Sequence, residues 1–450
     1  MKELDKIKYV FLLGIGGIGM SGLARYFKNR NCIVSGYDKT ETPLTKQLVQ
    51  EGISIIYVDD LNLVQDPFKD NSEEILIIYT PAIPVNNSIF TYFVQQGNIY
   101  KRSQVLGIIS EGMYTIAVAG THGKTTTSTI ITHLLKSGGI DCTAFLGGIS
   151  TNYHSNFLIG DSNVMVVEAD EYDRSFLTLH PDVAVITSMD ADHLDIYGNA
   201  ESLEKSFQLF ASQLKEGGQL FVKLGLDINQ NKKSYSVINT TDIYADNIRI
   251  NDGNYYFDFH NSDCTISNLT LGLAGMHNVE NAVVAIAVAL SQKINEEDLR
   301  QALKSYSGVK RRFEYIIKSN NQIYIDDYAH HPTEIEACIN SVKQLYPNKK
   351  LTVVFQPHLF TRTRDFASDF AISLSVADQL ILLNIYPARE LPIEGITSQM
   401  LLDLIQNPNK VLVADDELVA TIHKHKPELL LTLGAGDIDR FVEPLKLILS

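Results

Sequence analysis

No run of apolar residues in this sequence is long enough to cross a bilayer. The best candidate, Ala282–Leu290, is about half the length that a membrane-spanning helix needs. The segment Met1–Tyr9 mixes lysines with acidic residues and lacks the regions that make up a signal peptide. The four cysteines are scattered and form no CxxC pair, which disfavours a disulfide framework and a cysteine zinc site. We therefore expect a cytoplasmic protein that does not insert into membranes.

Positive charge is also scarce. The sequence has 38 lysines and arginines against 53 aspartates and glutamates, a formal net charge of −15. Such a surface repels nucleic-acid backbones, so we expect no nucleic-acid partner. An acidic protein can still bind phosphates where a loop supplies backbone amides and a few cations. The charge therefore limits the partners without excluding a nucleotide site.

The 450 residues exceed one ordinary core, so two or three domains are expected. A pattern of apolar run, glycine turn and amphipathic stretch predicts an α/β fold class. The pattern restarts three times, which predicts domains at residues 1–111, 112–307 and 308–450. Most apolar runs are followed by polar residues, and in open α/β sheets ligands bind at the carboxyl ends of strands. Within the second block, Gln219–Lys223 and the stretch 255–273 are expected as antiparallel additions.

The strongest motif follows the predicted strand Tyr114–Ala119 and opens a helix, which is the context of a phosphate-binding loop. Glycines let backbone N–H groups crowd an anion, and the helix N-terminus adds positive potential. The strict motif has glycine where Val118 stands, so this is a variant P-loop. Lys124 is expected to reach the ATP phosphates, and the Thr125 hydroxyl to ligate Mg²⁺. The predicted ATP-binding loop is Gly120, Thr121, His122, Gly123, Lys124, Thr125 and Thr126.

Acidic residues follow the next two predicted strands of this block. Glu168 ends an apolar strand, where a Mg²⁺ ligand of a P-loop protein belongs. Asp170, Glu171 and Asp173 are read equally well as a solvated loop. His193 lies among acids after the strand Val183–Thr187 and is a second candidate metal ligand. Two metal ions would neutralise an ATP tail and an acyl phosphate.

A second glycine-rich loop lies near the N-terminus and is similar to a dinucleotide fingerprint, with Asp38 ending the next strand. Alone it is a weak indication of NAD, because the same geometry holds any pyrophosphate, including that of UDP. One ligand being ATP and the other a nucleotide-linked substrate would explain two such loops in one chain. The predicted sugar-nucleotide site is Gly14, Gly16, Gly17, Ile18, Gly19 and Asp38.

Polar segments in the third block suggest an acceptor site. His330 and Asp327 could orient an incoming amine, and Arg362 or Arg364 could clamp a carboxylate in the planar geometry that guanidinium favours. Arg312 is a cation at the second domain boundary, where it could meet phosphates or serve only as part of a basic linker. Asn278 begins a helix and could simply cap it.

These motifs together resemble the Mur ligase family, over essentially the whole chain and in order. They are GIGGIGMSGLA, GTHGKTTT, EADEYDRSF, DADHLD, GMHNVENA, RRFE, DDYAHHPTEI, FQPHLFTRTRDF and LGAGD. The resemblance implies an N-terminal Rossmann-like domain for UDP-sugar, a central P-loop ATPase-type domain and a C-terminal Rossmann-like domain for the amino acid. It implies Lys124, Glu168, His193, His330 and Arg362 as catalytic residues, the metal ligands being Thr125, Glu168 and His193. It also implies His277, Asn278 and Arg312 at ATP, and Asp327, Tyr328, His330, His358 and Arg362 at the amino-acid end.

The resemblance is strongest to the branch that joins L-alanine to the lactyl carboxylate of UDP-N-acetylmuramate through an acyl phosphate, in peptidoglycan biosynthesis. It implies ATP and Mg²⁺, with Mn²⁺ possible, and we expect a monomer or weak homodimer. The alternative is the sister branch that adds a ready-made murein peptide, which shares EADEYD. FQPHLFTRTRDF favours the alanine-adding branch. Leu359 stands where that branch often has arginine.

Overall fold

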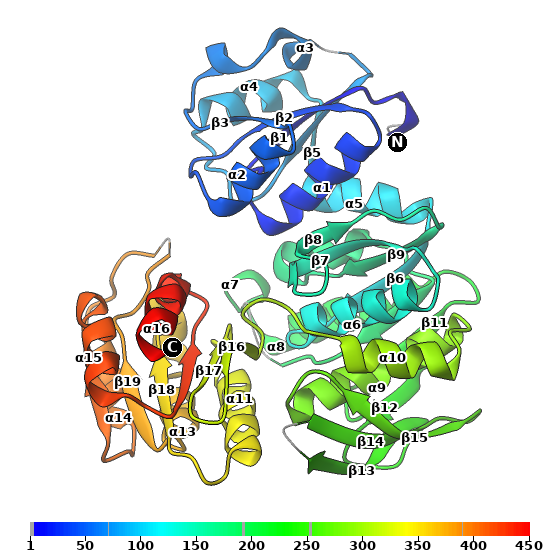
Figure 1. The fold of residues 1–450 in the computed structure, drawn as a ribbon. Helices are drawn as coiled ribbons and strands as arrows, with labels where there is room; N and C mark the ends of the chain where they lie inside the picture. Colours follow the sequence, from blue (N-terminus) through cyan, green and yellow to red (C-terminus); the bar gives the residue numbers. More distant parts are fainter. Residues whose placement is uncertain (1–3, 71, 191–193, 252–253, 389) are drawn as a thin grey trace. The chain divides into compact units, whose positions relative to one another are not determined.

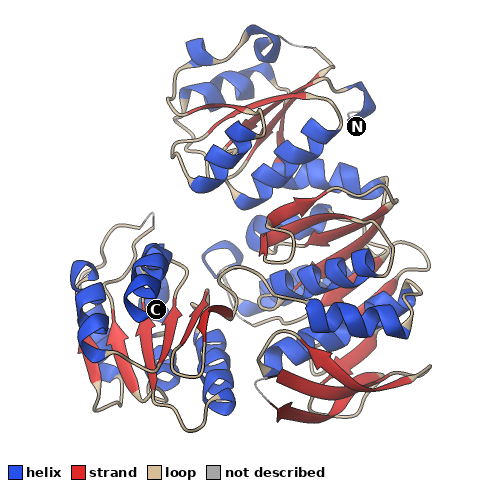
Figure 2. Cartoon of the chain, in the orientation of Figure 1, coloured by secondary structure: helices blue, strands red, loops and turns tan. Residues whose placement is uncertain are grey.

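The computed structural model describes residues 4–70, 72–190, 194–251, 254–388 and 390–450, without the side chains of residues 173, 194 and 195. The chain forms two compact units. The first comprises residues 1–246, 259–266 and 281–303, and the second comprises residues 247–258, 267–280 and 304–450. Helices and strands alternate along most of the chain (Figures 1 and 2), which confirms the α/β fold class. The predicted limits of the three domains stay predictions.

The first sheet has the strand order β3-β2-β1-β4-β5, and all its pairs are parallel. From β1 the chain builds one side of the sheet and then returns to build the other, so the turn after β1 lies at a topological switch point. Its strands are β1 Tyr9–Leu13, β2 Ile33–Tyr37, β3 Ser54–Ile56, β4 Ile75–Tyr79 and β5 Ile99–Lys101. Its helices are α1 Ile18–Asn29, α2 Pro43–Gln50, α3 Asp66–Lys69, α4 Ser88–Gln96 and α5 Arg102–Glu111.

The second sheet has the order β15-β14-β13-β12-β11-β10-β6-β9-β7-β8, which places β6 between two strands that come later in the chain. Its strands are β6 Tyr114–Ala119, β7 Thr143–Ser150, β8 Ser155–Leu158, β9 Val164–Glu168, β10 Val183–Ile186, β11 Gln219–Lys223, β12 Lys233–Ser236, β13 Ile243–Asn251, β14 Asn254–His260 and β15 Thr265–Leu271. The helices of this part are α6 Lys124–Ser137, α7 Leu194–Tyr197, α8 Ala200–Ser212, α9 Met276–Ser291 and α10 Glu296–Ser305.

One expectation for this sheet is wrong. The sequence predicts an antiparallel Gln219–Lys223, but β11 pairs in parallel with β10. The reason is the connection: α8 lies between the two strands in sequence, and a helical crossover returns the chain in the same direction.

The third sheet has the order β16-β17-β21-β18-β19-β20 and is parallel except for the antiparallel edge strand β16. Its strands are β16 Glu314–Lys318, β17 Ile323–Asp327, β18 Leu351–Phe355, β19 Gln379–Leu382, β20 Lys410–Leu412 and β21 Leu429–Leu433. Its helices are α11 Pro332–Leu345, α12 Phe360–Asp365, α13 Ala367–Leu374, α14 Ser398–Leu404, α15 Leu418–His425 and α16 Val442–Leu449.

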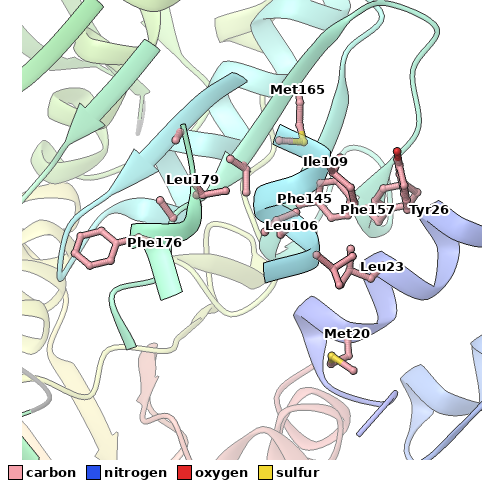
Figure 3. Close-up of a cluster of buried hydrophobic side chains, with 14 of the residues drawn as sticks. Met20, Leu23, Tyr26, Leu106, Ile109, Phe145, Phe157, Met165, Phe176 and Leu179 are labelled. Atoms are coloured by element: carbon pink, nitrogen blue, oxygen red, sulfur yellow. The ribbon is translucent and has the colours of Figure 1, made fainter. Parts of the chain in front are cut away.

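A single apolar core joins the first two sheets within the first unit (Figure 3). Buried side chains of α1, α5 and the strands β7 to β9 belong to one cluster, which includes Met20, Leu23, Tyr26, Leu106, Ile109, Phe145, Phe157, Met165, Phe176 and Leu179. The rings of Tyr26, Phe145 and Phe157 lie with centroids 5.0 to 6.5 Å apart. Across the described ranges, we find no helix with the length and apolar character needed to cross a membrane.

Candidate active site

The loop between β6 and α6 has, at two positions, a backbone conformation that strongly favours glycine. Gly120 and Gly123 have φ angles of +139° and +81°. A Cβ on Gly120 would lie 2.1 Å from Thr187 Oγ1, and one on Gly123 would lie 2.8 Å from Asn281 Oδ1. Thr125 follows in the first turn of α6, where it and Thr126 are buried. The loop therefore curls tightly against neighbouring segments and presents the start of a long helix, as anion binding requires.

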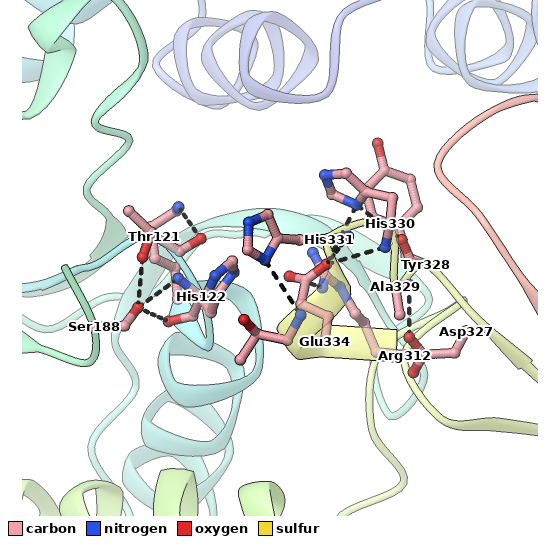
Figure 4. A network of polar contacts seen from close by, with 12 residues as sticks. Thr121, His122, Ser188, Arg312, Asp327, Tyr328, Ala329, His330, His331 and Glu334 are labelled. Atoms are coloured by element: carbon pink, nitrogen blue, oxygen red, sulfur yellow. Dashed lines mark hydrogen bonds and ion pairs between the residues drawn. The ribbon is translucent and has the colours of Figure 1, made fainter. Parts of the chain in front are cut away.

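Residues that follow β10 hold this loop in shape (Figure 4). The Thr121 and Ser188 hydroxyls lie 2.9 Å apart, and the His122 backbone N–H donates to Ser188 Oγ at 2.6 Å. The Asp190 N–H in turn donates to Thr121 Oγ1 at 3.1 Å. The His122 ring faces Asp190, with Nε2 3.4 Å from the carboxylate. Thr121 and His122 therefore form hydrogen bonds and an ion pair with the segment that follows β10.

Lys124 forms a buried ion pair that the sequence analysis missed. Its Nζ lies 2.7 Å from Glu171 Oε2 and donates to Gly120 O at 2.6 Å. Burial alone would lower the pKa of Lys124, but Glu171, Glu168 and Asp170 outweigh burial and raise it. Glu171 is only 1% exposed. The reading of Glu171 as part of a solvated loop is therefore wrong.

A signal for the burial of Glu171 is present in the sequence. Val167 and Ala169 alternate with more exposed residues, and this strand-like alternation continues beyond the end of β9 to Glu171. Tyr197 also donates its hydroxyl proton to Glu171 O at 2.6 Å, which holds the segment against α7.

Glu168 lies at the carboxyl end of β9, in register with Val118 of β6. The Gly147 N–H donates to Glu168 Oε2 at 3.0 Å, and a Cβ on Gly147 would lie 2.2 Å from both carboxylate oxygens. The Glu168 carboxylate and the Thr125 hydroxyl are hard oxygen donors of the kind that Mg²⁺ prefers. The chemistry of these donors therefore suits Mg²⁺, but among the described residues no three His, Cys, Asp or Glu side chains gather in a way that could hold a metal ion. His193, the other predicted ligand, lies outside the described residues.

The glycine loop after β1 is braced from its own sheet. Gly14 has a φ of +85°, and its N–H donates to Tyr37 O at 2.7 Å. The Gly16 N–H donates to Asp38 Oδ2 at 2.8 Å, and Asp38 Oδ1 accepts from Thr40 N–H at 3.1 Å. Asp38 therefore binds the loop itself. Gly17 is the residue before α1, and Ile18 and Gly19 form its first turn.

Arg102 is a second residue that the sequence analysis missed. A Cβ on Gly19 would lie 2.1 Å from the Arg102 guanidinium, so the guanidinium occupies the space that a side chain at this position would need. Arg102 Nη2 also lies 3.3 Å from Asp170 Oδ2. One arginine thus contacts the first turn of α1 and the acidic segment beside Lys124. Residues so distant in sequence give no local pattern that could reveal this.

In the second unit, Asp327 at the end of β17 is held by backbone. Its two carboxylate oxygens accept from the N–H groups of Phe313, at 2.6 Å, and of Ala329, at 2.7 Å. Burial raises the pKa of Asp327 to about 6, although Arg312 and these hydrogen bonds oppose the shift. Arg312 lies over the Tyr328 ring at 5.0 Å. Asp327 therefore orders the turn that presents Tyr328 (Figure 4).

His330 and His358 lie close together, with ring centroids 6.3 Å apart. Burial lowers the pKa of each to about 4, and Arg362 pushes both in the same direction. His330 Nδ1 lies 3.0 Å from Tyr328 O, so an Nδ1–H donated to this carbonyl leaves Nε2 as an acceptor. Leu359, with a φ of +71°, donates its N–H to Tyr386 O at 2.9 Å and starts α12. The predicted acceptor residues Tyr328, His330, His358 and Arg362 thus form one neighbourhood.

The first turn of α9 carries His277 and Asn278, the remaining predicted ATP residues. Burial lowers the pKa of His277 to about 4, with Glu334 opposing the shift and Arg312 adding to it. Asn278 donates from Nδ2 to Ala274 O at 2.5 Å. The Asn278 amide therefore holds the start of α9 to the preceding segment. This contact is not an N-cap, because Asn278 donates to a carbonyl, and its role at ATP stays a prediction.

Nearly the whole chain is similar to proteins of one family. Sequence models described as the Mur ligase family catalytic domain, the Mur ligase middle domain and the Mur ligase glutamate ligase domain match residues 10–114, 118–289 and 311–436. The chain is 51% identical to a UDP-N-acetylmuramate–L-alanine ligase of Christiangramia forsetii, over 99% of this chain and 98% of the relative.

Solved structures agree with the sequence matches. The crystal structure of a UDP-N-acetylmuramate–alanine ligase from Thermotoga maritima superposes with a TM-score of 0.82 at 26% identity, covering 97% of this chain and 98% of the other. A murein peptide ligase from Psychrobacter arcticus shares the fold, with a TM-score of 0.69 at 23% identity and 98% coverage of both chains. The chain therefore belongs to the Mur ligase family and has its three-domain α/β fold.

Proposed function

We propose that this protein is an ATP-dependent ligase that joins L-alanine to the lactyl carboxylate of UDP-N-acetylmuramate, a step of peptidoglycan biosynthesis. The observation that carries the proposal is full-length identity of 51% to an enzyme of that name, in a chain whose P-loop holds a buried Lys124–Glu171 pair. The proposed substrates are small molecules. A cytoplasmic location and a monomeric or weakly dimeric state stay part of the proposal.

The first half of the reaction is phosphoryl transfer. A carboxylate oxygen of the sugar nucleotide attacks the terminal phosphorus of ATP, an O–P bond forms and the bond to ADP breaks. Backbone amides of Gly120–Lys124 and the Lys124 ammonium bind and orient the phosphates and neutralise charge as it moves. Glu168 and Thr125, with His193, would hold Mg²⁺, which supplies further charge neutralisation when bound.

The second half is attack of the alanine amine on the acyl phosphate. A C–N bond forms, the amine loses a proton, and phosphate leaves as the C–O bond breaks. His330 is neutral at neutral pH because burial lowers its pKa to about 4, so Nε2 can accept a hydrogen bond from the amine. Arg362 is suited to bind the alanine carboxylate, because guanidinium pairs with carboxylate in a planar fork.

The sugar nucleotide is assigned to the loop Gly14–Gly19. Its pyrophosphate would meet backbone N–H groups at the start of α1, where the helix favours an anion. Arg102, which covers Gly19, supplies a cation at this point. Asp38 shapes the loop by accepting from Gly16 N–H.

The alternative function adds a murein peptide in place of alanine. The Psychrobacter arcticus ligase shares the fold at 23% identity, well below the 51% to the alanine ligase, and this difference favours alanine. The test is phosphate release by the full-length protein with ATP, Mg²⁺ and UDP-N-acetylmuramate. L-Alanine should trigger release, and Lys124→Ala should abolish it. Lys136→Ala, a change in the last turn of the same helix, is the matched control. Release that needs a tripeptide would assign the alternative.

A further inference from the structure

Asn156 is a fully buried side chain of the second sheet that contacts the glycine loop of the first. It lies on β8 and is 1% exposed. Its Nδ2 donates to Ile18 O at 2.6 Å and lies 3.2 Å from Ser21 Oγ. Ile18 is the first residue of α1 and part of the loop assigned to the sugar nucleotide. Asn156 therefore reaches the N-terminal end of α1, where the loop enters the helix.

Arg25 fixes the other side of the Asn156 amide. Its Nη1 donates to Asn156 Oδ1 at 2.8 Å, in a buried contact. Its Nε donates to Glu51 Oε2 and its Nη2 donates to Glu51 Oε1, both at 2.8 Å. With donors and acceptor engaged, the orientation of the Asn156 amide is determined by its partners, and a buried polar network satisfied in this way is rigid.

Apolar packing surrounds this network. Gly22 of α1 packs closely on the second sheet, since a Cβ there would be in ordinary van der Waals contact with Phe145, Phe157 and Asn156, at 3.4 to 3.9 Å. The rings of Tyr26, Phe145 and Phe157 belong to the core that joins the first two sheets (Figure 3). The polar contacts of Asn156 are therefore embedded in a packed interface, which holds α1 at a fixed position on the second sheet.

The glycine loop is thus held by side chains from both sheets. Asp38, from the first sheet, takes the Gly16 N–H before the helix, and Asn156, from the second sheet, takes the Ile18 carbonyl just inside it. A backbone amide binds a phosphate more tightly when it is already held in place, because binding then does not have to include the entropy cost of ordering the loop. The second sheet also carries the P-loop, so a residue of the ATP-binding part shapes the other nucleotide loop.

We propose that Asn156 is a positioning residue for the sugar-nucleotide loop, acting through Ile18 and Ser21. The proposal rests on the proposed function, since it takes the loop Gly14–Gly19 to bind the sugar nucleotide. Losing the Nδ2–H donor loosens the first turn of α1 and weakens sugar-nucleotide binding. Binding of ATP, whose loop Asn156 does not touch, stays as it is.

The experiment compares full-length wild type with Asn156→Asp. Aspartate keeps an oxygen for Arg25 but has no N–H to donate to Ile18 O. We expect KM and the calorimetric Kd for UDP-N-acetylmuramate to rise about tenfold, and KM for ATP and kcat to change less than about twofold. Amide hydrogen exchange of residues 18–22 should become faster in the unliganded variant. Asn163→Asp, the same change at an exposed position before β9, is the matched control.

Ser21→Ala serves if Asn156→Asp does not fold, because it removes the hydroxyl that Asn156 contacts and that itself donates to Ile18 O at 2.8 Å. We expect a smaller rise, about threefold, in KM for the sugar nucleotide. A folded Asn156→Asp protein with wild-type KM and wild-type exchange would overturn the proposal, and so would equal rises in both KM values. A wild type that binds no UDP-N-acetylmuramate would refute the proposed function instead, and the exchange measurement would still judge the role of Asn156.

Discussion

Lys124 Nζ and Glu171 Oε2 lie 2.7 Å apart in a buried ion pair at the start of the P-loop helix. Glu168 and Asp170 add to the negative potential at the ammonium. Lys124 is thus already held over its own loop by contacts to Gly120 O and Glu171. The charge that we propose meets the ATP phosphates is therefore kept in place by a carboxylate.

Glu171→Gln should destabilise the protein and increase the stabilisation that bound ATP provides. Removing one partner of a buried pair leaves the other charge uncompensated, which costs about 3–5 kcal/mol when the pair stands alone. We expect about 2 kcal/mol, because Glu168 and Asp170 remain. The phosphates of ATP would supply the missing negative charge, so ATP should raise Tm more in the variant than in the wild type.

Calorimetry with and without ATP measures this difference. Glu201→Gln is the control, since it breaks the exposed Lys205–Glu201 pair and should leave Tm and its response to ATP unchanged. An equal ATP response in wild type and Glu171→Gln would mean that the Glu171 charge does not matter to the nucleotide site.

Gly19→Ala should weaken sugar-nucleotide binding through Arg102. The new methyl group would lie 2.1 Å from the guanidinium, which must move and give up its contact with Asp170. We expect KM for UDP-N-acetylmuramate to rise about tenfold, with KM for ATP little changed. Steady-state kinetics with each substrate varied in turn measures both values.

The double variant Gly19→Ala/Arg102→Ala tests whether the clash is the cause. If Arg102 is the obstacle, the two changes should be less than additive in free energy. Gly112→Ala is the control, because its Cβ would meet nothing closer than 3.8 Å. Additive effects would mean that Gly19 and Arg102 act independently.

His330 should stay neutral well below its ordinary range. Burial lowers its pKa from 6.5 to about 4, so the unfolded chain binds this proton more readily than the folded one between these values. The contribution of the neutral His330 ring to the free energy of unfolding is therefore fully present above pH 6.5 and is lost as the pH falls toward 4. Each tenfold difference in proton affinity between the folded and unfolded chain corresponds to roughly 1.4 kcal/mol of this stability.

Histidine-labelled NMR follows this titration directly, with His330→Gln to assign the resonance. The His330 ring should titrate with a midpoint near 4, and Tm of His330→Gln should fall less steeply than wild type between pH 6.5 and 4. His423→Gln, at an exposed position, should follow the wild-type curve. A midpoint near 6.5 for His330 would show that burial does not lower its pKa, which would contradict this account.

Features that follow from local sequence are predicted well. β6 and β11 begin and end at the predicted residues, because each is an apolar run bounded by polar or turn residues. The edge strand β16, Glu314–Lys318, escapes prediction, because it is half exposed and its apolar run is only three residues long, Tyr315–Ile317. The P-loop is recognisable because glycine, lysine and helix start are neighbours in sequence.

Features that depend on distant contacts are not predictable in the same way. Arg102 lies over Gly19, Glu171 meets Lys124, and Asn156 holds Ile18, each across a long stretch of chain. The alternation around β9 indicates that Glu171 is buried, but no period or motif in a single sequence records which residue each of these side chains contacts. The same holds for Asp327, whose two carboxylate oxygens accept from the N–H groups of Phe313 and Ala329. The sequence does not reveal these backbone contacts, and the role of Asp327 at the amine stays a prediction.

The most direct test of the central claim follows a heavy-oxygen label. UDP-N-acetylmuramate labelled in its lactyl carboxylate is incubated with the full-length protein, ATP, Mg²⁺ and L-alanine, and phosphate and product are analysed by mass spectrometry. Transfer through an acyl phosphate predicts one labelled oxygen in the released phosphate and a product heavier by one alanine residue. Unlabelled phosphate, or a product that forms only with a murein tripeptide, would contradict the account.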